Sequence, residues 1–147
     1  MNWSHFLNQG KVERHDTTKR EIDDLRGLVA RNLKDASLPR LSADNRLGLS
    51  YEAGLILAKM AICCAGYRVK GPAHHKTMFE ALPLAMGPSV QDMADFLEQC
   101  RRNRNAISYD AAGMVGDGEA AAAHREVVAF EIVVESWILA HHAAFRR

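Results

Sequence analysis

The chain lacks the features that would place it at once in a well-marked class of protein. Its formal net charge is only +1 at pH 7, so it has no general excess of positive charge for binding duplex nucleic acid. A local basic patch stays compatible with that value. We see no apolar run long enough to predict a membrane span. The first residues hold neither a continuous apolar stretch nor a small-residue cleavage site, so we expect no signal peptide and a cytoplasmic location.

Cysteine is scarce, with three residues at Cys63, Cys64 and Cys100. An odd number that includes an adjacent pair does not suggest a disulfide framework, so reduced thiols are expected. The adjacent pair, even if joined by His74 and His75, lacks the gap of two to four residues usual between paired zinc ligands. We therefore expect no metal and no other cofactor.

Signals for β-strands are weak as well. No alternating run of Val, Ile and Thr is present, and no Asn-Gly or Asp-Gly turn separates apolar strands. Apolar residues recur instead at spacings of three and four. The pattern predicts an all-α fold, a bundle of about five helices, with sheet absent or negligible. A length of 147 residues suits one domain with a real core, so we predict a single domain over residues 1–147.

Helix boundaries are marked by capping residues and breakers. Thr18, with Glu21 three residues later, predicts a capping box at the start of the first long helix. Ser42 predicts the start of a second long helix, and Gly66 its end. The segment 67–76 is predicted to be a loop, because a Gly-Pro pair interrupts it.

Shorter elements complete the prediction. A helix is expected from about Thr77 until Pro83 kinks or ends it. The residues before the first long helix, 1–15, are expected to form a short extra helix or an arm.

The last predicted helix, from about Glu119 toward His142, is more apolar than a surface helix needs to be. Its apolar stripe is widened by Ile132, Val133 and Leu139. Such a helix is either central in the bundle or shared with a second subunit, and we expect a homodimer. Within it, Glu131 and Glu135 either pair with arginines across that interface or face solvent.

The most informative local feature is the run 101–110, RRNRNAISYD, at the end of an amphipathic helix. At 100° per residue, Arg104 falls on the apolar stripe of that helix. A guanidinium there must be paired or face a wet cleft. Two interpretations follow: Arg104 pairs with a carboxylate such as Glu98 or Asp110, or it faces a groove that binds an anion, for which its planar fork of donors is suited.

Neighbouring residues also have two interpretations each. Arg101 and Arg102 either contact phosphates or form a solvated helix end. The segment His74-His75-Lys76 either contacts a nucleotide or is an exposed loop. Tyr51 either packs on Arg104 at the cleft or belongs to the core or an interface.

The order of these landmarks resembles the HEPN domains, which are small all-α modules. The resemblance covers residues 44–110 and is carried by DNRLGLSYEAGLILAKMAICCAGYRVKGPAHHKT, FEALPLAMG and RRNRNAISYD. In these families a long helix with a Tyr-Ala-rich face precedes a Gly-Tyr-Arg turn and a His-Lys loop. A later helix then ends in Arg-Asn. The flanking helices fit in length and placement only.

Ribonucleases of that superfamily have an arginine, four further residues and then a histidine. Arg104 and Asn105 match the opening of this motif, but Tyr109 occupies the histidine position. Histidine exchanges protons near neutral pH, whereas tyrosine, with a reference pKa of about 10, seldom does. The resemblance therefore implies a nucleotide- or RNA-binding module with weak or no nuclease activity. The binding residues expected on this basis are Arg101, Arg102, Arg104, Asn105 and Asp110.

The resemblance further implies a toxin–antitoxin or defence-type system, with a nucleotidyltransferase or an antitoxin as a protein partner. Two alternatives stay open. The first is a metal-independent ribonuclease that uses Arg104 with Tyr109 or Asp110, which requires the helix to end or loosen near Ile107 so that one cleft holds both. The second is a structural or interaction protein that is indifferent to RNA.

Overall fold

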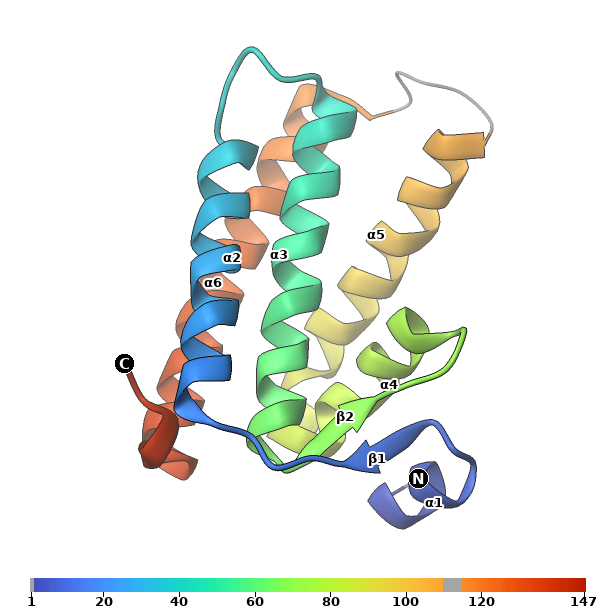
Figure 1. The fold of residues 1–147 in the computed structure, drawn as a ribbon. Helices are drawn as coiled ribbons and strands as arrows, with labels where there is room; N and C mark the ends of the chain where they lie inside the picture. The colour runs from blue at the N-terminus through green and yellow to red at the C-terminus, as the bar shows by residue number, and fades with distance from the viewer. Residues whose placement is uncertain (1, 110–114) are drawn as a thin grey trace.

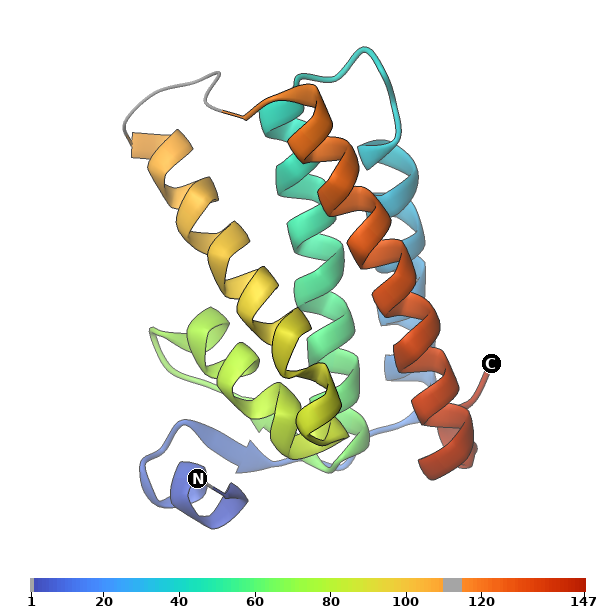
Figure 2. The same ribbon diagram turned by 180° about the vertical axis from the view of Figure 1, so that it is seen from behind.

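The computed structural model describes residues 2–109 and 115–147, with 105–109 described as helical backbone. Four long helices dominate it (Figure 1). They are α2 (Lys19–Ala36), α3 (Ala43–Cys64), α5 (Gln91–Tyr109) and α6 (Asp117–His141). The shorter helices α1 (Trp3–Asn8) and α4 (His74–Met86) lie near one end of the bundle (Figure 2), and the turns η1 (Pro88–Val90) and η2 (Ala143–Phe145) follow α4 and α6. The predicted all-α class is confirmed at this level.

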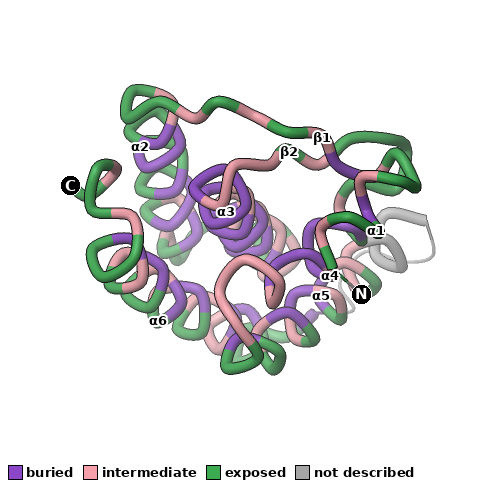
Figure 3. The backbone as a smooth tube through the Cα atoms, turned by 90° about the horizontal axis from the view of Figure 1, so that it is seen from below, coloured by how far each residue is buried: buried purple, intermediate pink, exposed green. Residues whose placement is uncertain are grey.

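Helix α3 is the centre of the bundle and packs against α2, α4, α5 and α6 (Figure 3). Apolar or small residues occupy nearly its whole circumference, because partners surround it. Gly54 permits the approach of α5: a Cβ atom there would lie 2.5 Å from Leu97 Cδ2, closer than carbon atoms tolerate. This close approach fixes the distance between α3 and the helix that carries the arginines.

The predicted helix boundaries on α2 and α3 are confirmed. The Thr18 hydroxyl accepts a hydrogen bond from the backbone N–H of Glu21, and Ser42 caps α3 in the same way through Asn45. Gly66 follows the end of α3 with a φ of 92°, a conformation that glycine adopts without the strain of a Cβ atom.

Sheet is negligible, as expected, but it is not absent. Strand β1 (Val12–Arg14) pairs antiparallel with β2 (Tyr67–Val69), and Trp3 of α1 stacks on Tyr67 with ring centroids 4.1 Å apart. Strands of three residues are too short to give a readable alternation, which is why 67–69 was predicted as loop. Residues 3–14 thus form both a short helix and a strand.

Helix α4 begins earlier than predicted, and α5 reaches beyond Ile107. Helix α4 begins at His74, three residues before the predicted start, and Pro83 lies inside it. Helix α5 continues as helix through Ile107 to Tyr109, so the end or loosening near Ile107 that the ribonuclease hypothesis requires is absent from this backbone.

Within residues 2–109 and 115–147, one helix meets the length and composition of a membrane span, contrary to the prediction from the sequence. It is α3, whose most apolar window is 72% buried inside the bundle. Burial of that extent is what the core helix of a soluble protein shows, since its apolar residues are already covered by other helices.

Candidate functional site

Arg104 lies on the side of α5 that faces α3. Its Nη1 donates a hydrogen bond of 2.8 Å to Oε1 of Glu52, and its guanidinium carbon lies 5.5 Å from the ring centroid of Tyr51. The two side chains of this ion pair are 43% and 34% exposed. The carboxylate interpretation is therefore correct in kind, but the partner is Glu52 and not Glu98. The alternative partner, Asp110, lies outside the described residues.

A cavity of about 420 Å³ opens beside this ion pair, between the first half of α3 and α5. Arg104 and Glu52 line it together with Asn45 and Gly48. Its volume lies within the range of small-molecule sites. Both signs of charge are present in its wall, so an anion that enters must compete with Glu52 for the guanidinium.

Tyr51, on α3, contacts both Arg104 of α5 and His75 of α4. The residue is 1% exposed, and its hydroxyl lies 3.1 Å from Nδ1 of His75. Burial raises the pKa of Tyr51, so the phenol keeps its proton. Burial, aided by neighbouring His74, lowers the pKa of His75, which favours a neutral imidazole. Tyr51 satisfies both interpretations, because it is a core residue whose ring also packs under Arg104.

A second cavity, of about 310 Å³, lies at the N-terminus of α4. It is lined by Pro72, Ala73, His74, His75, Lys76 and Arg101. The sequence suggested the histidine–lysine segment and Arg101 as separate features, and the fold brings them together. In the part of the chain that the structure describes, no side chain caps the first turn of α4, whose N–H groups lack intrahelical acceptors and favour an anion.

Glu98 forms ion pairs with Arg101 and Arg102, the two arginines that precede Arg104 in the motif. It accepts hydrogen bonds from Arg101 Nε and Nη2 at 3.0 and 2.7 Å, and from Arg102 Nε at 3.4 Å. These contacts, first of all the hydrogen bond from Arg101, hold the pKa of Glu98 below its usual value. The Arg102 side chain is 66% exposed and therefore solvated, but it lies within α5, which ends at Tyr109, and not at the helix end that the sequence suggested. Arg101 lines the cavity at the N-terminus of α4, whereas Arg102 lines a separate, smaller cavity of about 140 Å³.

Three predicted site residues cannot be placed by their side chains. Asn105 and Tyr109 belong to the part of α5 described as backbone, and Asp110 lies outside the described residues. Two contributors were missed: Glu52 as the partner of Arg104, and the contact of His75 with Tyr51. No pattern in the sequence predicts either contact, because each depends on how α3 packs against α5 or α4.

Glu135 shows a further correction. Arg26 Nε and Nη2 each donate to its carboxylate at 2.9 Å, so its partner lies within the same chain rather than across an interface. On the same helix, the apolar residues that widened the predicted stripe are exposed: Ile132 64%, Val133 47% and Leu139 60%.

Comparison of the chain with known proteins found no relative. No family model, curated protein or solved structure matches the chain.

Proposed function

We propose that the chain is a binding module for RNA or a nucleotide, which it holds through phosphate. The proposed site is the α3–α4–α5 face, defined by Tyr51, His75, Lys76, Arg101 and Arg104. The observation that carries the proposal is the second cavity, where a guanidinium, an ammonium group, two imidazoles and an uncapped helix N-terminus surround one space. The guanidinium, the ammonium group and the helix N-terminus attract a phosphate, and a neutral imidazole can donate one hydrogen bond to it.

The Glu52 carboxylate does not prevent such binding, whereas Glu98, which accepts hydrogen bonds from Arg101 at 3.0 and 2.7 Å, competes with a phosphate for that guanidinium. Glu52 and Arg104 are both more than a third exposed, and ion pairs of that kind contribute only about 0–1 kcal/mol. A phosphate can therefore replace Glu52 at small cost. Until it does, the ion pair holds the guanidinium over Tyr51, so little conformational freedom is lost on binding.

The resemblance to HEPN domains supports RNA or a nucleotide as the ligand, within a toxin–antitoxin or defence-type system. It also supports a nucleotidyltransferase or antitoxin partner and a homodimer. The exposed apolar residues of α6 offer the dimer a surface. Nuclease activity is expected to be weak, since no histidine occupies position 109.

One observation favours ribonuclease activity as a second candidate function. His75 lies beside the Arg101 cavity, and its lowered pKa suits an imidazole that accepts a proton near neutral pH. In that case His75, and not Tyr109, takes the proton of the attacking 2′-hydroxyl. Loss of cleavage in His75→Gln, with RNA affinity retained, is the result expected of this alternative.

Fluorescence anisotropy with labelled single-stranded RNA tests the binding proposal. Arg101→Ala and Arg104→Ala should each weaken binding about 10- to 100-fold, the equivalent of one hydrogen bond to a charged group. Arg31→Ala is the matched control, an exposed arginine on α2. Affinity should also fall steeply with salt. Absence of binding by the wild type, or equal affinity of all three variants, contradicts the proposal.

A further inference from the structure

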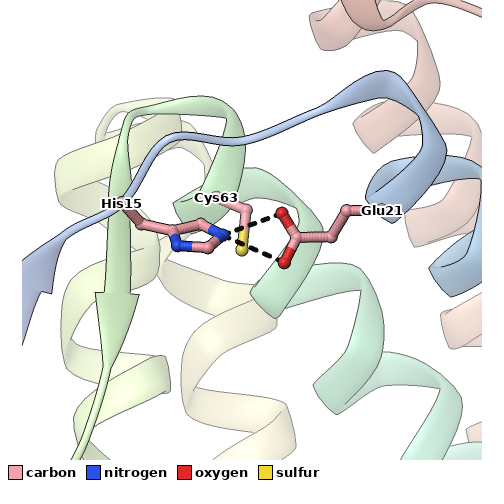
Figure 4. Close-up of side chains that lie close together, drawn as sticks. All are labelled: His15, Glu21 and Cys63. Atoms are coloured by element: carbon pink, nitrogen blue, oxygen red, sulfur yellow. Dashed lines mark hydrogen bonds and ion pairs between the residues drawn. The ribbon is translucent and has the colours of Figure 1, made fainter.

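Three side chains from separate segments meet at the end of α3 remote from Arg104 (Figure 4). His15 belongs to the connection between β1 and α2, Glu21 to the first turn of α2, and Cys63 to the last turn of α3. His15 Nε2 lies 2.8 and 3.0 Å from the two carboxylate oxygens of Glu21. The imidazole nitrogen, a carboxylate oxygen and the Cys63 sulfur all lie within 4.8 Å of one another.

Backbone contacts hold the three residues in place independently of their side-chain tips. The N–H of His15 donates to the carbonyl of Gly66 at 2.9 Å. The hydroxyl of Thr17 donates to the carbonyl of Cys63, and the N–H of Glu21 is held by Thr18. The segment 15–21 is thereby fixed against the end of α3. This keeps the three potential metal-ligand atoms, one from each residue, close to one another.

We infer that His15, Glu21 and Cys63 bind a zinc ion. Imidazole, carboxylate and thiolate are its usual ligands, at about 2.0–2.3 Å from the metal. Tetrahedral geometry at those lengths separates ligand atoms by about 3.3–3.8 Å, so shifts of roughly an ångström or less convert the observed cluster into a coordination sphere. One carboxylate and one thiolate neutralise the two positive charges. The thiolate also selects zinc over magnesium or calcium, which prefer oxygen.

Zinc binding requires protons to leave the Cys63 sulfur and Nε2 of His15. Burial raises the pKa of Cys63 to about 11, so the free protein holds a thiol there. Zinc displaces that proton to solvent. In the free protein Nε2 of His15 carries the proton that it donates to Glu21, so coordination through Nε2 requires this proton to move to Nδ1 or, from a doubly protonated ring, to leave for solvent. Lys59 and Arg68 act on the same sulfur and favour its thiolate.

Three protein ligands leave a fourth position of the tetrahedron for water or another small ligand. Solvent reaches it from the side of His15 and Glu21, whose side chains are 22% and 32% exposed. Coordination also connects the N-terminal segment to α2 and α3. Because the cluster requires the folded chain, zinc should stabilise the native state by mass action.

Cobalt(II) is the probe for a direct test on the full chain, freed of metal and kept reduced. Binding through Cys63 predicts one cobalt per chain, the visible bands of a tetrahedral site and a thiolate-to-cobalt charge-transfer band, all removed by added zinc. Cys63→Ser should abolish the charge-transfer band. The matched control is Cys64→Ser, which removes the adjacent buried thiol outside the cluster and should retain the band. His15→Ala and Glu21→Gln should each weaken cobalt binding at least about tenfold.

A thermal melt of the wild type keeps the test decisive if Cys63→Ser does not fold. Zinc at one hundred times its dissociation constant should raise the melting temperature by about 5–10 °C in a chain of this size. The inference is overturned by an unchanged melting temperature, or by cobalt spectra without a thiolate band. It is equally overturned by a band that survives in Cys63→Ser, since the metal would then be bound elsewhere.

Discussion

The ion pair between Arg26 and Glu135 is predicted to be the charged contact on which folding stability depends most. Arg26 lies on α2 and Glu135 on α6, and their side chains are only 9% and 16% exposed. The guanidinium also donates to Asp23 Oδ1 at 2.6 Å and to the carbonyl of Phe145 at 2.6 Å. One side chain therefore connects α2, α6 and the C-terminal turn.

Replacement of Arg26 by alanine leaves Glu135 charged in a poorly hydrated position. Loss of one partner from a buried pair typically costs about 3–5 kcal/mol. The lower end of that range is expected, because Arg147 Nε also lies 3.0 Å from Glu135 and keeps part of the compensation. For a chain of this length, about 3 kcal/mol corresponds to a fall in melting temperature of about 6–12 °C.

Circular dichroism melts of three variants measure this effect. Arg31→Ala, an exposed position on the same helix, is the control and should change the stability by less than about 0.5 kcal/mol. The double variant Arg26→Met with Glu135→Leu should recover most of the loss, since apolar replacement of both partners leaves no unpaired charge. A melting temperature for Arg26→Ala within about 3 °C of the wild type, or a double variant less stable than Arg26→Ala, would refute the reasoning.

Three further predictions follow from the same contacts. Arg104→Ala should lower the free energy of unfolding by no more than about 1 kcal/mol in a thermal melt, because its ion pair with Glu52 is partly exposed. By NMR, His75 should titrate below 6.5, so its contribution to stability is complete above that pH and is lost as pH falls through its lowered pKa; a value above 6.5 would contradict this. Sedimentation at tens of micromolar should show a dimer that Ile132→Asp dissociates, whereas a monomeric wild type would exclude α6 as an interface.

Sequence reasoning succeeded where structure depends on neighbouring residues. The capping of α2 by Thr18 involves atoms only three positions apart, and the turn at Gly66 depends on its own φ. Strand β1 pairs with β2 across more than fifty residues, over only three positions each. No local pattern encodes such a pairing, because the residues that make its contacts lie far apart in the sequence.

The candidate site shows the same division. The stripe on α5 indicated that Arg104 faces inward, but its partner Glu52 lies 52 positions earlier. The identity of that partner depends on the crossing of α3 and α5, which Gly54 sets through its contact with Leu97. The cluster of His15, Glu21 and Cys63 is still less local, since three segments form it and no pair of them has the spacing of a zinc motif.

The ion pair of Arg104 with Glu52 and the proposed metal cluster are far enough apart to be tested independently. Glu52 and Cys63 lie eleven residues apart on α3, about 16 Å along a straight helix. Substitutions at that separation, with no shared partner, usually have additive effects. A loss of RNA affinity in Arg104→Ala therefore carries no information about the metal, and a loss of the cobalt band in Cys63→Ser carries none about phosphate. If both variants lost both properties, the common cause would be unfolding of α3, which a far-ultraviolet spectrum of each variant would reveal directly.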